Sequence, residues 1–225
     1  MPKYLFAPAF AGVVLLAGCS SLADQQAQRI AAIPEAKRAY IIGTYAIGCE
    51  RNKNNCQQMF NAISTYYRKP EEKDTVYLFQ ISSGHVLTSD EVPDFTNMER
   101  REKGNYFCVA LPAGRFSVFT YDFYNFANGG MRYSLPKDSI FDVPFTLAEG
   151  EVVVIGSLKV TTATGKNLLG MQLPAPGKLL LSSSSDEAQA KALQKCPADV
   201  RTRPVRSAPL RPDGSSQYVI LDPKP

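Results

Sequence analysis

Runs of β-branched and aromatic residues, separated by turn-forming residues, dominate the middle of the chain. Runs typical of strands lie at 40–47, 75–81, 106–111, 115–123, 140–147 and 151–160. Glycine, proline or asparagine stands between them, as at 112–114 and 128–130. Because no amphipathic helix interrupts the series, the pattern predicts a mainly β fold, an antiparallel β-sandwich with short helical additions.

Two segments outside this series follow a helical pattern. Residues 22–38 are rich in Ala, Gln, Arg and Glu, which predicts a helix that Pro34 ends or kinks and that serves as a stalk or docks loosely. A serine run at 182–185, followed by two acidic residues, predicts a second helix that reaches Cys196.

Residues 56–68 fit two patterns. Their apolar positions recur at helical spacing, whereas the Thr-Tyr-Tyr run at 65–67 favours a strand. We favour the strand, because a bridge between Cys49 and Cys56 would then close a hairpin loop.

The N-terminus has the layout of an export signal. Its apolar stretch, 5–16, is short for a membrane-spanning helix and is interrupted by Pro8. The run Leu16-Ala17-Gly18-Cys19, followed by Ser20, resembles the lipobox of bacterial lipoproteins. The resemblance implies cleavage before Cys19 and lipid on its sulfur and freed amine, and several acyl chains make a stable anchor.

In that family, Ser20 in place of aspartate implies the outer membrane, so we expect a lipid-anchored envelope protein facing the periplasm. The alternative is an ordinary signal peptide with an unrelated cysteine. The chain then divides into a signal peptide (1–18), a lipidated stalk or helix (19–38), a β domain (39–182) and a C-terminal helix with a Pro- and Arg-rich tail (183–225).

Four cysteines remain beside the lipobox cysteine, and export places them in an oxidising compartment. Of the three possible pairings we favour Cys49 with Cys56, which bracket a short polar turn, and Cys108 with Cys196, which would hold the C-terminal segment on the domain. No Cys-x-x-Cys pair is present and the only histidine, His85, is distant in sequence, so zinc binding is disfavoured.

Composition adds little about function. With 44% hydrophobic residues in 225, the chain can bury a core. The 25 basic and 21 acidic residues nearly balance, which gives no indication of a nucleic-acid partner.

The segment 108–116, Cys-Val-Ala-Leu-Pro-Ala-Gly-Arg-Phe, resembles the strand, Leu-Pro-x-Gly turn and aromatic strand of transthyretin-like and carboxypeptidase-regulatory-like β-sandwiches. Many uncharacterised bacterial lipoproteins follow that plan. The resemblance covers about residues 75–160 and implies a fold, because the motif marks a turn and such a fold carries no function by itself.

Motifs of common enzymes are missing from the sequence. There is no Gly-x-Ser-x-Gly elbow, phosphate-binding loop, dinucleotide fingerprint or His-Glu-x-x-His helix, so we expect no cofactor and no metal. The alternative is an envelope glycan hydrolase with a carboxylate pair. Its candidate acids are Asp90, Glu91, Asp94, Asp122 and Asp142, of which spacing singles out no pair.

Residues 116–126 alternate so that Phe119, Tyr121 and Phe123 share one face, and Val118, Thr120, Asp122, Tyr124 and Phe126 share the other. One face must be core. At the hairpin tip, aromatic rings and amides suit a sugar or a peptide, which makes a candidate binding patch of Tyr124, Asn125, Phe126 and Asn128. Ordinary cross-strand packing is the alternative, and we favour it.

The tail alternates Arg201, Arg203, Arg206 and Arg211 with prolines, so we expect it to be extended and open to contact. It could engage lipopolysaccharide phosphates or an acidic partner, but a solvated connector to a last strand at 217–221 is the favoured interpretation. Together the signals predict a non-catalytic structural, assembly or binding protein, tethered to a membrane beside another envelope protein or a glycan.

Overall fold

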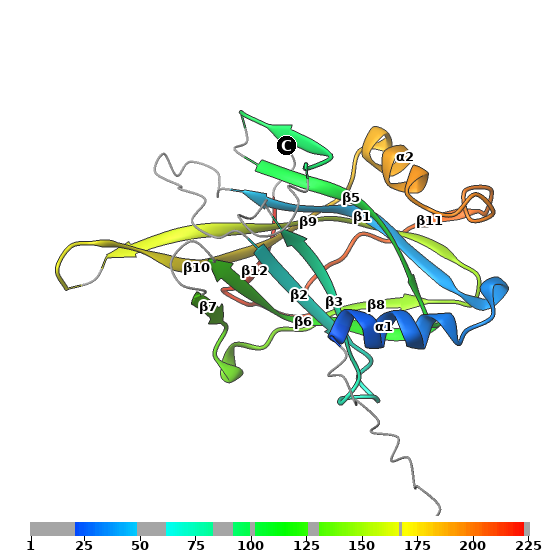
Figure 1. The fold of residues 1–225 in the computed structure, drawn as a ribbon, viewed down its shortest axis with the longest axis horizontal. Coiled ribbons are helices and arrows are strands. Elements are labelled where there is room, and N and C mark those ends of the chain that lie inside the picture. Colours follow the sequence, from blue (N-terminus) through cyan, green and yellow to red (C-terminus); the bar gives the residue numbers. More distant parts are fainter. Residues whose placement is uncertain are drawn as a thin grey trace, which may run out of the picture.

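A computed structural model describes residues 21–48, 62–82, 92–99, 102–125, 131–166 and 168–222. Within these ranges the chain forms two β-sheets and two α-helices (Figure 1), and the prediction of a mainly β fold is confirmed. Sheet A contains β1 (Ala39–Gly48), β4 (Phe95–Asn97), β5 (Glu102–Leu111), β9 (Val152–Lys166), β10 (Gln172–Ser182), β11 (Val205–Ser207) and β12 (Val219–Leu221). Sheet B contains β2 (Ala62–Arg68), β3 (Val76–Ser82), β6 (Gly114–Asn125), β7 (Met131–Ser134) and β8 (Val143–Leu147). The helices are α1 (Leu22–Ala31) and α2 (Asp186–Gln194), and short 3-10 turns lie at Glu35–Lys37 and Lys137–Ser139.

Sheet A is mixed, and the prediction of a purely antiparallel arrangement is wrong. β1 pairs antiparallel with β5 but parallel with β9, and β9 and β10 also accept β11 and β12 as parallel neighbours. All ten residues of β1 are buried, as expected for a central strand covered on both faces. Strand direction depends on long connections, and period-two alternation carries no information about them.

The main core takes side chains from both sheets. Ile41 and Tyr45 of β1 lie in one cluster with Tyr67 of β2 and Phe116 of β6. The Tyr45 hydroxyl, 2.6 Å from Thr65 Oγ1, joins the sheets by a buried hydrogen bond. Because buried hydroxyl groups need partners, this bond lets a polar tyrosine sit in the core.

A β-bulge in β6 changes which side chains face the core. Two consecutive residues of β2, Tyr66 and Tyr67, lie opposite Thr120 and Val118 of β6. Phe119 is therefore an extra residue on β6. Val118, Tyr121 and Phe123 are fully buried, whereas Phe119 is only half-buried. Tyr121 and Phe123 therefore share a face as predicted, but Phe119 does not lie with them and Val118 does, because alternation reverses across a bulge.

The Leu-Pro-x-Gly segment is a corner between the sheets and not a hairpin turn. β5, which ends at Leu111, belongs to sheet A, and β6, which begins at Gly114, belongs to sheet B. Gly114 has a φ of +142°, which L side chains rarely adopt. The turn chemistry is thus real, but the two strands that it joins do not pair.

Several local predictions are confirmed. Residues 62–68 form β2, although 56–61 lie outside the described residues. β6 and β7 form the predicted hairpin, and α2 is capped by Ser185, whose Oγ accepts from the Ala188 amide. The sequence pattern does not predict β4, β10 and β11.

The N-terminal helix α1 is docked along β3, the edge strand of sheet B (Figure 1). Gln26 Oε1 accepts from the Leu78 amide at 3.0 Å, and the Arg29 guanidinium donates to the Val76 carbonyl at 3.0 Å. The same guanidinium lies 5.1 Å from the centroid of the Tyr77 ring. Side chains of α1 therefore satisfy the open backbone of an edge strand, which is otherwise a template for unwanted pairing.

Candidate functional site

The predicted binding patch is only partly within the described residues. Tyr124 and Asn125 end β6, whereas Phe126 and Asn128 lie outside the described ranges. Tyr124 is half-buried and lies beside Arg132 of β7, whose guanidinium carbon is 5.6 Å from the ring centroid. The hairpin pairing of β6 with β7 places these two side chains together.

Asp122 is the centre of a polar cluster on sheet B, which we call the Asp122 cluster and define as Tyr66, Asp122, Tyr124 and Arg132. Arg132 donates to one Asp122 carboxylate oxygen from Nε at 3.1 Å and from a terminal nitrogen at 2.5 Å. The Asp122 side chain is 4% exposed and that of Arg132 is 56% exposed. The buried carboxylate thus holds the guanidinium in place, and the guanidinium extends to the surface.

The protonation behaviour of this cluster follows from its burial and its ion pair. Burial raises the pKa of the Tyr66 hydroxyl, and the negative charge of Asp122 raises it further. The hydrogen bonds to Asp122 raise the pKa of Arg132. Tyr66 is therefore a neutral donor, and Asp122 is an ion partner that orients Arg132. Exposed donors beside ring faces are suited to binding a polar ligand.

A hollow of about 500 Å³ lies between this cluster and α1. Arg29 lines it from the helix, Tyr66, Asp122 and Arg132 from the sheet, and Ile140 from the loop before β8. A second hollow of about 650 Å³ is lined by the C-terminal loop 212–218 and shares Phe119 and Ile140 with the first. The two hollows are therefore neighbours on sheet B, and we call the pair the furrow.

Among the described residues, neither hollow is lined by two of the acidic candidates for a hydrolase. Asp94 accepts from the Tyr106 amide and lies 2.7 Å from Lys195 Nζ. Asp122 lines the first hollow, whereas Asp142 lines the second and accepts from the Ser117 hydroxyl. Asp90 and Glu91 lie outside the described residues, as does His85.

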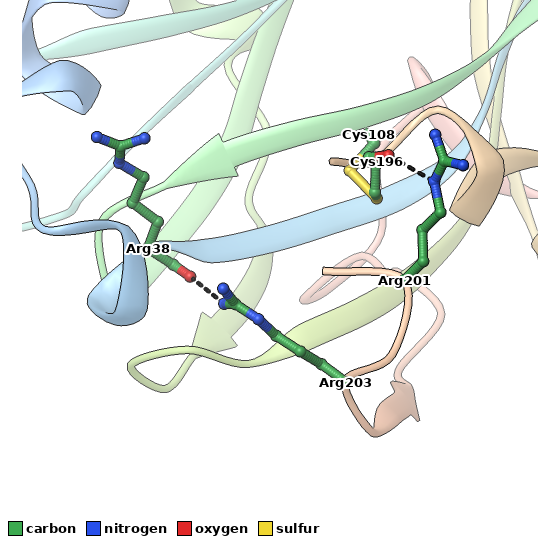
Figure 2. Close-up of a disulfide and its surroundings, with 5 residues drawn as sticks. All are labelled: Arg38, Cys108, Cys196, Arg201 and Arg203. Carbon is green, nitrogen blue, oxygen red and sulfur yellow. Dashed lines mark hydrogen bonds between the residues drawn. A yellow bond between two sulfur atoms is a disulfide. The ribbon is translucent and has the colours of Figure 1, made fainter. Parts of the chain in front are cut away.

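The predicted disulfide between Cys108 and Cys196 is confirmed (Figure 2). It joins β5 to the second residue after α2, across a sequence separation of 88. Ala192, Cys196 and Val200 of this segment are buried against Ile42 of β1 and its neighbours in sheet A. The bridge predicted for Cys49 and Cys56 lies outside the described residues.

The tail remains largely exposed although three of its arginines make hydrogen bonds. Arg201, Arg206 and Arg211 are exposed, in keeping with a tail open to contact, whereas Arg203 is half-buried. Arg201 donates from Nε to the Cys196 carbonyl at 2.8 Å, and Arg203 donates to the Arg38 carbonyl at 3.4 Å (Figure 2). Arg206 forms an ion pair with Glu151 and donates to the Thr146 carbonyl. Main-chain carbonyls and two carboxylates, those of Glu151 and Asp199, thus occupy donors that would otherwise be offered to phosphate.

Two kinds of feature are absent from the described residues. Among them, no group of three His, Cys, Asp or Glu side chains is placed to hold a metal ion. Likewise, none of the helices in that part of the chain is long and apolar enough to cross a membrane.

The sequence signal pointed to Tyr124 and named Asp122 only as one acid among several. It missed Tyr66 and Arg132, which reach the site through the pairing of β2 and β7 with β6. Only a correct strand pairing, which a single sequence does not contain, would have joined them.

Comparisons with known proteins give no family. No family model matches the chain, and no curated protein matches it significantly. Among solved structures, a leucine-rich repeat protein from Bacteroides thetaiotaomicron is similar over 56% of this chain and 14% of its own, with 13% identity and a TM-score of 0.29. A likeness at that level carries no argument about fold or function.

Proposed function

We propose that this protein is a lipid-anchored component of the bacterial cell envelope with a non-catalytic binding or assembly role. The supporting observation is the position of the lipobox relative to α1. Only Ser20 separates Cys19 from Ser21, which caps α1, and two residues span at most about 8 Å. A lipid on Cys19 would therefore hold α1, and the domain on which it docks, close to a bilayer.

The two sheets and their shared core support a β-sandwich for this domain, with a mixed sheet in place of the antiparallel one. The furrow across sheet B is the proposed binding surface. Tethering raises the local concentration of this surface against neighbouring glycans or envelope proteins, so a modest intrinsic affinity suffices. By the lipoprotein resemblance, Ser20 after the lipidated cysteine favours the outer membrane, and we propose that the domain faces the periplasm.

Two measurements test the anchor, one on the native protein and one on a variant that lacks Cys19. The intact mass of the purified protein should correspond to a chain that begins at Cys19 and carries acyl groups. A chain that begins at Ser20, exported behind an ordinary cleavable signal, should leave the membrane fraction and keep its fold. A native chain that retains 1–18, or an unmodified Cys19, would contradict the proposal.

Photocrosslinking in intact cells tests the furrow. A photoreactive residue at Ile140, 49% exposed and lining both hollows, should capture a specific partner or glycan. The matched control is Val205 of β11, which is 41% exposed and lines neither hollow. Identical products from both positions, or only abundant bulk proteins, would contradict a dedicated binding surface.

A further inference from the structure

The hairpin of β9 and β10 continues beyond the rest of sheet A. The last residue of β9 that pairs with β1 is Thr161, opposite Gly48. Beyond it, residues 162–166 pair with 172–176 of β10 and with no other described strand. We call residues 162–176 the arm, and Figure 1 shows it projecting as a two-stranded ribbon away from the other elements.

The base of the arm is fixed to the domain. The hydroxyl of Tyr121, from sheet B, donates to the Gly177 carbonyl at 2.8 Å. Thr161 Oγ1 accepts from the Lys178 amide at 2.8 Å. A Cβ on Gly177 would lie 1.8 Å from the Thr161 carbonyl oxygen, so β9 and β10 approach there at a distance that only glycine permits. The arm therefore leaves the domain in a set direction.

The tip of the arm is apolar and exposed. Leu168 is fully exposed, Leu169 is 82% exposed and Met171 is 55% exposed. Gly170 between them has a φ of +79°, which turns the chain. Single exposed apolar residues are ordinary, but three large ones within four positions at the end of a projecting ribbon indicate a contact surface.

The charge pattern of this region favours a lipid surface as the occupant. From Val152 to Ser185 the sequence contains three lysines and no aspartate or glutamate. One of these lysines, Lys159, is buried in ion pairs with Glu102 and Asp222. An acid-free segment is not repelled by anionic headgroups, and leucine and methionine side chains are stabilised at the boundary of the acyl chains.

We propose that the tip, Leu168 to Met171, inserts into the interfacial layer of a bilayer that contains anionic phospholipid. This inference rests on the proposed lipid anchor, which brings a bilayer within reach. A second point of contact, besides the lipid, stops the domain from rotating about its anchor. It thereby sets which face of the domain, and so which end of the furrow, points away from the membrane.

The absence of tryptophan from the chain allows a direct test. We place Leu169→Trp in the full lipidated protein and reconstitute it in phosphatidylethanolamine and phosphatidylglycerol vesicles. The indole emission of this variant should shift to shorter wavelength and be quenched by brominated acyl chains. The matched control is Met98→Trp, at a residue that is also 82% exposed but lies beside β4, and its emission should stay that of a hydrated indole.

Flotation of the same samples with the vesicles reports the lipid anchor separately. If the Leu169→Trp protein floats while its indole emission stays hydrated and unquenched, the arm proposal is overturned and the proposed function stands. Protein that does not float contradicts the anchor, and a blue shift on addition of vesicles would then still support the tip. Shielding of the indole in whole envelopes but not in pure lipid indicates a protein partner and overturns the lipid assignment.

Discussion

The two chain ends are attached to the β domain in opposite ways. α1 has no fully buried residue. Of its side chains, Ile30 packs, partly buried, against the main core, and the other contacts that hold the helix are hydrogen bonds and one cation–π contact to β3 and Tyr67. The C-terminal segment instead contributes buried side chains, two strands of sheet A and a disulfide. One attachment is therefore polar and reversible, and the other is covalent and cooperative with the core.

The difference is informative because the polar attachment is the one next to the proposed lipid. Local opening costs least where few apolar contacts are lost, so α1 should detach long before the domain unfolds. Detachment would expose the β3 edge. It would also remove one wall of the furrow, since Arg29 of α1 lines the first hollow. The membrane-facing end can thus adjust while the fold stays intact.

The largest expected effect comes from removing the bridge. A double substitution, Cys108→Ala with Cys196→Ala, should lower the free energy of unfolding by about 4 to 5 kcal/mol, because an 88-residue separation closes a long loop. Urea denaturation measures it. The matched variant, Cys49→Ala with Cys56→Ala, opens a shorter predicted loop and should cost less. Equal stability of the bridge variant and the native protein would show that strand pairing alone holds the C-terminal segment.

A smaller and more local effect is expected at α1. Gln26→Ala removes the acceptor of the Leu78 amide, which should lower stability by about 1 kcal/mol and speed exchange of that amide severalfold. Hydrogen exchange resolved by residue measures it. Gln28→Ala, at an exposed position of the same helix, is the control and should leave Leu78 unchanged. Unchanged exchange in both variants would mean that α1 does not protect the β3 edge.

The same division between local and long-range contacts explains what the sequence could predict. Three kinds of predicted feature depend on near neighbours in sequence, and all appear in the structure. They are the capped start of α2, the six strand-like runs and the end of α1 before Pro34. The Cys108–Cys196 bridge was predictable because few cysteines were available to pair. Apart from this bridge, the sequence signals lie within a few residues of the element that they specify.

The features that could not be predicted depend on partners distant in sequence. Parallel pairing of β1 with β9 joins residues more than a hundred positions apart, and the bulge at Phe119 is defined only against β2. Arg203 finds the Arg38 carbonyl, so its role in the tail could not be seen in the tail itself. For the same reason Tyr124 was noticed for its neighbours in sequence, whereas Arg132 and Tyr66, which complete its site, were not.

The smallest expected effect on stability is electrostatic. It separates the contribution of one ion pair from the other contacts that hold the C-terminal segment. Hydrogen bonds from Arg206, just inside β11, hold the pKa of Glu151 below its ordinary value of 4.5. A carboxyl whose pKa is lowered on folding stabilises the fold above its unfolded pKa, and this contribution is lost as the pH falls through the lower folded value. Glu151→Gln should therefore cost less than about 1 kcal/mol at pH 7, since the Arg206 side chain is 48% exposed.

Urea denaturation across a pH series measures this contribution. The difference between native protein and Glu151→Gln should shrink steadily as the pH falls below 4.5, where the native carboxyl becomes protonated in both states. Glu149→Gln is the control, because its carboxylate is 60% exposed and lies 3.4 Å from Lys37 Nζ, and it should change stability less at every pH. A gap that stayed constant into acid would assign the role of Glu151 to packing. The C-terminal segment would then be held by strand pairing, buried side chains and the disulfide, without a contribution from this ion pair, and its contrast with the polar attachment of α1 would be greater.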